Sequence, residues 1–253
     1  MSVSVETHKQ LRHRLRSKWR KLAPHLYWGD DLDVRYHLAG HLKTVRDRRV
    51  LDLGCGPGFL LMEVPDNNLR VGFDLNLEAI SIATQHRGKD RLFLVASLLD
   101  LPFKGGAFDL CIMANVLPGW SFSVEGQPEK QRFRVIEECR RVVADESEVW
   151  VTMVNGDSPI YGGLSKATPR AFRRLVDPFF AITSMIYWNP FTTMIFFIPR
   201  ALLALIPRGV RRWTYIPPRL LERLPWIDAL LALCGERWRI SRGRHFFARM
   251  APR

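Results

Sequence analysis

The fold is decided by the stretch Val50-Leu51-Asp52-Leu53-Gly54-Cys55-Gly56-Pro57-Gly58-Phe59-Leu60. An apolar run of strand length leads directly into a turn with glycine at every second position. Glycine has no Cβ, so this backbone can turn sharply and approach a ligand closely. The helix that follows offers N–H groups without partners in the helix itself. Such a strand–turn–helix unit is where open α/β sheets bind nucleotides.

Two common nucleotide-binding motifs are absent from this turn, and their absence limits the classes of nucleotide that it is expected to bind. The dinucleotide fingerprint G-x-G-x-x-G fails, because its last position falls on Phe59 or Leu61, depending on which glycine starts the count. The sequence also lacks a G-x-x-x-x-G-K-[ST] phosphate loop. Asp52 instead adds a carboxylate at the turn. A negative charge there favours a ligand with an ammonium or sulfonium group over a polyphosphate.

Strand and helix patterns alternate on both sides of the turn, which predicts parallel pairing and a doubly wound α/β sheet. The predicted strands are Arg49–Leu53, Arg70–Asp74, Arg91–Val95, Phe108–Ala114, Val149–Val154, Ala181–Trp188 and His245–Met250. The predicted helices are a basic amphipathic one over Leu11–Leu22, then Val34–Val45, Phe59–Val64, Leu77–His86, Pro128–Ala144 and a short one from Thr168-Pro169 to Asp177.

Further motifs downstream extend the pattern. Asp74 ends the second predicted strand, where a carboxylate can accept both hydroxyls of a ribose. The later motifs are Leu101-Pro102-Phe103, Ala107-Phe108-Asp109-Leu110 and Asn115-Val116-Leu117. With the glycine turn, these residues resemble the class I S-adenosylmethionine-dependent methyltransferases, specifically the small-molecule type 11 group. The resemblance covers about residues 48–155. It implies a Rossmann-like, seven-stranded sheet with helices on both faces and the last strand antiparallel.

The resemblance also implies S-adenosylmethionine as the cofactor. The glycine turn would hold its methionine part, Asp74 its ribose, and the residues after the third and fourth core strands its adenine and sulfonium ends. Ser97 stands where the family usually has Asp, and a hydroxyl accepts a weaker hydrogen bond than a carboxylate does. The implied cofactor-binding residues are Asp52, Gly54, Cys55, Gly56, Gly58, Asp74, Leu75, Ser97, Leu98 and Asn115.

The expected reaction is an in-line displacement at the sulfonium methyl, which needs position, a dry pocket and in some enzymes a base. The resemblance does not fix that base. The candidates by residue type are His25, Tyr27, Tyr36, His37 and His41, although lid packing or surface placement is the favoured interpretation for them. Asn115-Val116-Leu117-Pro118 departs from the [NDS]-P-P-[FYW] signature of exocyclic-amine methylation. This departure argues against a nucleic-acid amino-methyltransferase.

The composition of the chain excludes several classes of protein. The chain has 253 residues, of which 47% are hydrophobic and 25% charged, which excludes a disordered polyelectrolyte and a collagen-like repeat. Its four cysteines lie far apart without C-x-x-C spacing, so we expect reduced thiols, no metal site and a cytoplasmic protein. The first residues, MSVSVETHKQ, have no apolar region typical of a secretory signal. Pro190 interrupts the uncharged stretch 178–199, which argues against a spanning helix.

Positive charge gathers at the two ends of the chain. Residues 1–23 carry seven basic residues and one acid, and residues 200–253 carry twelve arginines and three acids. We expect four segments: a helical N-terminal extension or lid (1–47), the methyltransferase core (48–188), an apolar, arginine-rich helical insert (189–238) and a closing strand with its tail (239–253). The basic ends leave three interpretations open: a cover over the substrate pocket with a solvated basic face, peripheral attachment to an anionic inner membrane surface, and RNA binding.

The apolar insert leads to the hypothesis of a small hydrophobic or lipid-linked methyl acceptor. Two alternatives remain at this point: an RNA methyltransferase, and a non-catalytic protein that binds S-adenosylmethionine as a ligand. The sequence does not define the oligomeric state.

Overall fold

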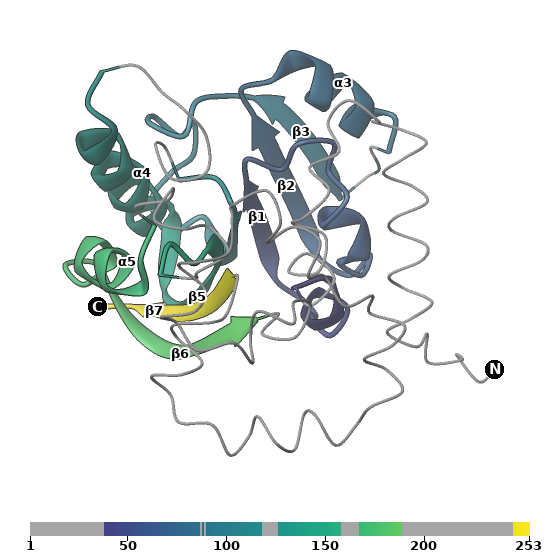
Figure 1. Ribbon diagram of the computed structural model, residues 1–253. Helices are drawn as coiled ribbons and strands as arrows, with labels where there is room; N and C mark the ends of the chain where they lie inside the picture. The colour runs from purple at the N-terminus through teal and green to yellow at the C-terminus, as the bar shows by residue number, and fades with distance from the viewer. Residues whose placement is uncertain (1–37, 87, 89, 118–125, 158–166, 189–244) are drawn as a thin grey trace, which may run out of the picture.

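The computed structural model describes residues 38–86, 88, 90–117, 126–157, 167–188 and 245–253. These residues form a seven-stranded sheet with the order β3-β2-β1-β4-β5-β7-β6 (Figure 1). The strands are β1 (Arg49–Leu53), β2 (Leu69–Asp74), β3 (Arg91–Val95), β4 (Phe108–Ala114), β5 (Val143–Val154), β6 (Phe180–Trp188) and β7 (His245–Pro252).

The pairing confirms the predicted doubly wound topology. β1 pairs in parallel with β2 and with β4, β2 pairs in parallel with β3, and β4 with β5. β7 is antiparallel to both of its neighbours, β5 and β6, as the family resemblance implies. The strand order reverses at β1, because the chain runs outward to β2 and β3 and then returns to β4. The carboxyl ends of β1 and β4 therefore flank the switch point where open α/β sheets bind ligands.

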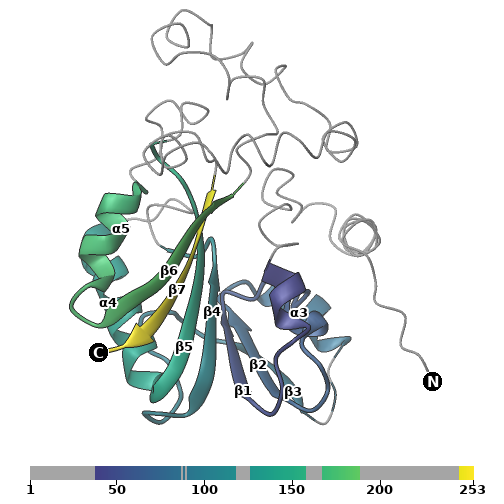
Figure 2. The same cartoon turned by 90° about the horizontal axis from the view of Figure 1, so that it is seen from below.

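Helices cover both faces of the sheet (Figure 2). α4 (Pro128–Val142) and α5 (Pro169–Val176) lie on one face, and α3 (Leu77–Thr84) lies on the other. Asn76 caps α3 and Thr168 caps α5 through side-chain oxygens that accept backbone N–H bonds, and each helix accordingly begins at the next residue.

Several predicted boundaries differ from the structure. β2 and β6 begin one residue earlier than predicted, α3 ends at Thr84 and β7 ends at Pro252. Two further differences change the type or the extent of an element. The helix predicted over Phe59–Val64 is only the short 3-10 helix η2 (Leu61–Glu63), because Pro65 follows at once and leaves no room for a full α-helix. The helix predicted to reach Ala144 ends at Val142, and β5 begins at Val143, which pairs with Phe108 of β4. A buried apolar residue fits either element, so periodicity alone could not separate them.

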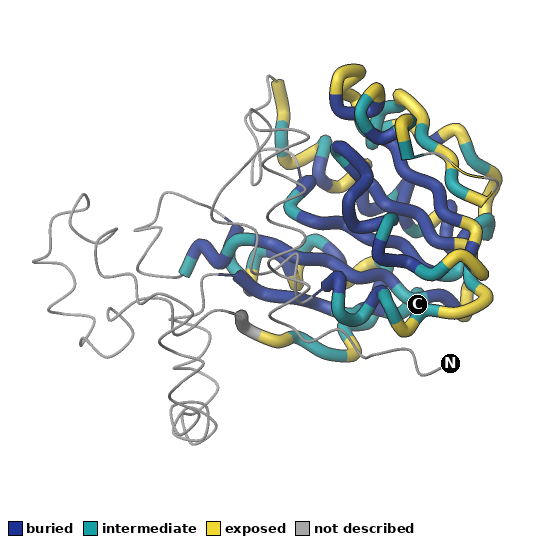
Figure 3. Tube along the Cα trace, turned by 90° about the vertical axis from the view of Figure 1, so that its right-hand side faces the viewer, coloured by how far each residue is buried: buried dark blue, intermediate teal, exposed yellow. Residues whose placement is uncertain are grey.

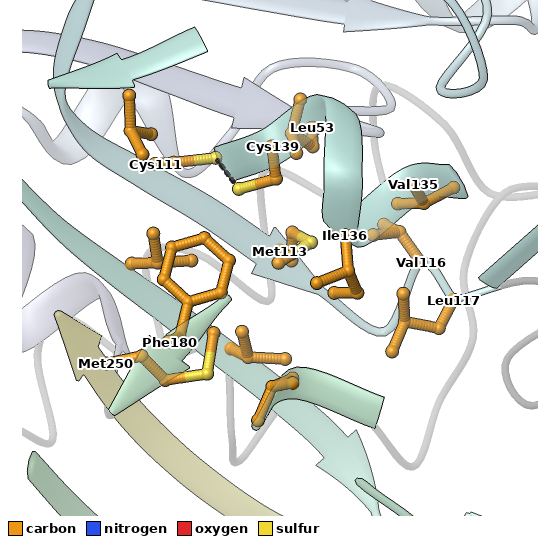
Figure 4. Close-up of a cluster of buried hydrophobic side chains, with 14 of the residues drawn as sticks. Leu53, Cys111, Met113, Val116, Leu117, Val135, Ile136, Cys139, Phe180 and Met250 are labelled. Carbon is orange, nitrogen blue, oxygen red and sulfur yellow. Dashed lines mark hydrogen bonds between the residues drawn. The ribbon is translucent and has the colours of Figure 1, made fainter. Parts of the chain in front are cut away.

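Two apolar clusters fill the space between the sheet and its helices, and the tube in Figure 3 shows the strands largely buried. The larger cluster joins the sheet to α4 and α5, with Leu53, Met113 and Ile136 among its members (Figure 4). It includes Cys111 and Cys139, whose sulfur atoms lie 3.5 Å apart as free thiols. The smaller cluster lies on the other face and joins η2, Val50 and Trp150 to the helical residues 38–42.

Several predictions fall on residues outside the described part of the chain. They are the amphipathic helix over Leu11–Leu22, the first residues of the Val34–Val45 helix, the insert 189–238 and Cys234. Among the residues that the structure does describe, no helix is long and apolar enough to cross a membrane.

The F-D motif has a structural role at the start of β1. The Asp109 carboxylate accepts hydrogen bonds from the backbone N–H of Arg49 at 2.8 Å and from its guanidinium at 2.6 and 3.0 Å. The hydrogen bond from the Arg49 side chain is the main cause of a pKa of Asp109 below its ordinary value. Asp109 therefore fastens the first residue of β1 to β4, at the end of the sheet away from the glycine turn.

The L-P-F motif is held by two residues of α4. Glu138, which is 1% exposed, accepts the backbone N–H of Leu101 at 2.8 Å. Arg141 binds the Glu138 carboxylate at 2.7 Å and donates to the carbonyls of Leu101 and Phe103 at 2.8 and 2.7 Å. This clamp fixes the connection from β3 to β4, which contains no helix.

Replacing Glu138 with glutamine should lower the free energy of unfolding by about 2 kcal/mol at pH 7, because a buried charge-assisted pair is lost. The hydrogen bond from Arg141 holds the pKa of Glu138 below its ordinary value of 4.5. The contribution of this carboxylate is therefore complete above about pH 4.5 and fades as the pH falls through the folded-state pKa. Urea unfolding at pH 7 and pH 4 measures the effect.

Glu137→Gln is the matched control for this experiment. Glu137 neighbours Glu138 on α4 and pairs with Arg134 at 2.6 Å, but its side chain is 44% exposed. Its loss should change stability by no more than about 0.5 kcal/mol. Equal losses in the two variants at pH 7 would contradict the clamp.

Candidate functional site

The glycine turn is anchored to β2 through its backbone. Gly54, Gly56 and Gly58 have positive φ angles of 71°, 52° and 77°. The N–H groups of Gly54 and Cys55 both donate to the carbonyl of Phe73, each at 2.9 Å. Positive φ is the region that glycine adopts without steric cost, so glycine is the residue that follows this path with the least strain.

The three glycines differ in what surrounds them. A Cβ on Gly54 would lie 2.5 Å from Val116, and one on Gly58 would lie 2.5 Å from Phe93, so both positions are closed by packing. A Cβ on Gly56 would meet nothing within 4 Å. The turn therefore presents its bare backbone to open space at Gly56, which is the position where a ligand can approach the main chain.

Asp74 ties this turn to the start of α3. One carboxylate oxygen accepts the N–H of Gly56 and the other accepts the N–H of Asn76, both at 2.9 Å. An ionised carboxylate has about four acceptor sites, so each oxygen keeps a lone pair for a further hydrogen bond. Sequence reasoning did not single out Asn76 as part of this arrangement. An Asn just before a helical pattern is a recognisable cap signal that could have found it.

Asp52 and Cys55 are buried beneath the turn. Asp52 is 1% exposed and lies in β1 opposite Gly72 and Ile112 of the neighbouring strands. Burial raises the pKa of the Cys55 thiol strongly, and the negative charges of Asp52 and Asp74 raise it further. Cys55 is therefore a neutral packing residue and has no chemistry of its own at neutral pH.

The predicted adenine-side residues follow β2 and β3. Leu75 is 73% exposed directly after Asp74, so its apolar side chain is available to a planar group. The Ser97 hydroxyl oxygen accepts the N–H of Leu99 at 3.2 Å and keeps a second lone pair. Leu98 packs against the larger apolar cluster.

Asn115 closes the site at the end of β4. It has a φ of 56°, and its N–H donates to the carbonyl of Thr152 at 2.9 Å. Its side-chain oxygen and nitrogen are both buried and hydrogen-bond to none of the described residues. The same holds for the hydroxyl of Thr152, which sequence reasoning missed. A threonine within the apolar run Val149–Val154 was the available signal, because buried hydroxyls need partners.

Only His41 among the candidate bases falls within the described residues. Its Nδ1 lies 3.0 Å from a guanidinium nitrogen of Arg249. Arginine can only donate hydrogen bonds, so Nδ1 accepts this one and carries no proton. The ring also stacks against Phe247 and meets Trp150 edge-on. These contacts give His41 a packing role, and His25, Tyr27, Tyr36 and His37 lie outside the described residues.

The structure thus brings the glycine turn, Asp74 and Asn115 to the switch point, with Leu75, Ser97 and Leu98 after the neighbouring strands. The donor set fits a cofactor with a ribose and an amino-acid part. Its acceptors are Asp74 and Asn115, the open backbone at Gly56 allows close approach, and the set contains no cluster of basic side chains for a polyphosphate.

Comparison with known proteins shows which family and which folds the chain resembles. Residues 51–151 match the family described as a methyltransferase domain. The malonyl-[acyl-carrier protein] O-methyltransferase of Legionella pneumophila is 38% identical over 86 residues, which are 32% of this chain and 30% of that protein. The match therefore spans less than a third of that relative's length.

Solved structures extend the likeness to nearly the whole chain. The N-methyltransferase NodS of Bradyrhizobium japonicum, in complex with S-adenosyl-l-homocysteine, has a TM-score of 0.56 and 13% identity, covering 96% of this chain and 98% of that one. A TehB-like, S-adenosylmethionine-dependent methyltransferase of Corynebacterium glutamicum has a TM-score of 0.53 and 16% identity, with coverage of 96% and 98%. At these identities the likeness establishes the fold.

Proposed function

We propose that the chain, whose residues 51–151 match a methyltransferase domain, transfers the methyl group of S-adenosylmethionine to a small acceptor. The observation that carries the proposal is the open backbone of Gly56 beside the Asp74 carboxylate. The buried, unsatisfied side chain of Asn115 on the adjoining strand adds a third group that a ligand would complete.

Each residue has a binding or orienting role in this proposal. The glycine turn holds the amino-acid part against bare backbone, and Asp74 accepts the ribose hydroxyls. Leu75, Ser97 and Leu98 line the adenine, and the buried Asp52 carboxylate keeps the turn electrically negative toward a cation. When bound, S-adenosylmethionine would supply a methyl group on a positively charged sulfur. This methyl carbon is open to in-line attack by an acceptor atom, with the sulfur as the leaving group. Asn115 and Val116 orient and shield that end of the pocket.

We further propose that the acceptor is hydrophobic or lipid-linked and that the insert 189–238 covers it. The support is the sequence of that insert, which contains the apolar pieces Thr192–Ile198, Ala201–Ile206 and Pro225–Cys234. The Legionella relative is named for a malonyl group on a carrier protein, so an acyl group on a carrier belongs to the same class of acceptor.

Incubation of the purified full chain with methyl-labelled S-adenosylmethionine and a cell extract tests both parts of the proposal. We expect one S-adenosylhomocysteine for each methyl transferred, with the label in the organic-soluble fraction or on an acyl carrier. Heat-denatured protein is the control. If ribonuclease releases the label, the methyl acceptor is RNA and the proposal of a hydrophobic or lipid-linked acceptor is wrong. If calorimetry shows that the protein binds the cofactor but no S-adenosylhomocysteine forms, the protein is a ligand-binding protein and not an enzyme.

A further inference from the structure

A second pocket lies at the other end of the sheet from the glycine turn. Its volume is about 350 Å³, and it opens beside the amino ends of β1 and β4, on the face that carries the smaller apolar cluster. Its lining includes Arg46, Arg48, Glu148, Trp150 and Arg249. None of these residues belongs to the proposed cofactor site.

Arg249 is held rigidly in this pocket by aromatic rings. β5 and β7 place it directly opposite Trp150 in the antiparallel ladder. Its guanidinium carbon lies 4.9 Å from the centre of the Trp150 ring and 5.6 Å from that of Phe247. The Nδ1 atom of His41 accepts one of its hydrogen bonds at 3.0 Å. A guanidinium has five N–H donors in a planar fork, so several donors remain for another partner.

The pocket carries more positive than negative charge. Arg46, Arg48 and Arg249 contribute three permanent cations, and Glu148 is the one acid in the lining. Glu148 is already engaged, because it accepts the indole N–H of Trp150 at 2.9 Å and lies 3.8 Å from a guanidinium nitrogen of Arg48. Within the described residues, no carboxylate pairs with Arg249. A partly buried cation without a counter-charge is costly, and an anionic ligand would remove that cost.

We propose that this pocket binds a phosphate group, with Arg249 as the preformed receptor and with Arg46 and Arg48 at the mouth. Arginine forks match phosphate oxygens in pairs, and a net positive lining suits a doubly negative group. The volume leaves room for a small organic part next to the phosphate. The phosphate belongs either to a soluble phosphate ester or to a lipid headgroup, two sources that share one recognition chemistry.

Calorimetric titration of the full chain with inorganic phosphate and with glycerol 3-phosphate tests the proposal. We expect a Kd of about 1 mM or tighter for one site, and a loss of about tenfold or more in Arg46→Ala/Arg48→Ala. Both arginines lie at the surface end of the pocket, so this variant should keep the fold. Arg249→Lys keeps the charge but loses the fork, and it should weaken binding similarly. Because this change also alters the contacts of Arg249 with Trp150 and His41, a thermal melt measures its effect on stability separately.

Lys104→Ala/Lys130→Ala is the matched control, since it removes two exposed positive charges elsewhere on the surface. Equal weakening in this control, or a wild type that neither binds the soluble phosphate probes saturably nor floats with the vesicles described next, would contradict the proposed phosphate site. Flotation with phosphatidic acid vesicles in phosphatidylcholine separates the two sources. Flotation that is lost in the arginine variant assigns a lipid headgroup, and binding of the soluble probes without flotation assigns a soluble ester. Affinity for S-adenosylmethionine should not change in either variant, so this result stands apart from the proposed function.

Discussion

Replacing Gly56 with alanine should leave the fold intact and weaken S-adenosylmethionine binding by about tenfold to a hundredfold, which corresponds to about 1.4 to 2.8 kcal/mol. A Cβ at this position meets no atom of the described residues within 4 Å, so this part of the chain tolerates the methyl group apart from the cost of its positive φ. That methyl group would occupy the space through which a ligand reaches the backbone. Calorimetry for affinity and a thermal melt for stability measure the two effects separately.

Gly106→Ala is the matched control for this variant. Gly106 also has a positive φ, of 66°, and a Cβ there also meets nothing within 4 Å. It lies in the turn before β4, where its N–H donates to the carbonyl of Arg141. Both variants should lose about 1 kcal/mol of stability, and only Gly56→Ala should lose affinity. If Gly56→Ala binds S-adenosylmethionine as tightly as the wild type does, the cofactor does not bind against Gly56.

Replacing Asp74 with asparagine should weaken cofactor binding by about tenfold to a hundredfold, since charged acceptors of hydrogen bonds contribute about 1.5 to 3 kcal/mol. The amide has nearly the same volume, but it has only one acceptor oxygen for the N–H groups of Gly56 and Asn76. One of these N–H groups would face an NH₂ group, which also loosens the turn. Titration with S-adenosylmethionine and with S-adenosylhomocysteine measures the loss for donor and product.

The comparison of donor with product separates two roles of Asp74. Both ligands carry the ribose, so a role on the ribose hydroxyls predicts equal losses for the two. A larger loss for the sulfonium donor would mean that Asp74 acts through its charge instead. Asp145→Asn is the control, because Asp145 is an exposed carboxylate paired with Arg140, and its change should leave both affinities as they are.

The sequence was most informative where one local pattern decides the structure. The bounds of β1, β3 and β4 agree with their predicted ranges, since each is an apolar run flanked by turn residues. The glycine turn could also be predicted from the sequence, because backbone positions with positive φ angles strongly favour glycine. The individual cofactor contacts remain predictions that the variants above test.

The features that the sequence did not reveal depend on residues far apart in the chain. Arg249 meets Trp150 only because β7 inserts between β5 and β6, and no local pattern reports such a pairing. The clamp of Glu138 on Leu101 joins residues 37 positions apart. The L-P-F and F-D motifs were visible as a family pattern, but their partners Arg141 and Arg49 became apparent only with the packed structure.

The clamp on the L-P-F segment also bears on how the chain folds as it is synthesised. The backbone groups of Leu101 and Phe103 have their partners on α4, which the ribosome completes later. Until the chain has emerged past Arg141, the glycine turn and first three strands can assemble, but the crossing to β4 has nothing to lock it. A nascent chain stalled before that point would leave uncovered the apolar residues that pack in one cluster with α4, among them Leu53 and Phe73, and a chaperone would be expected to bind there.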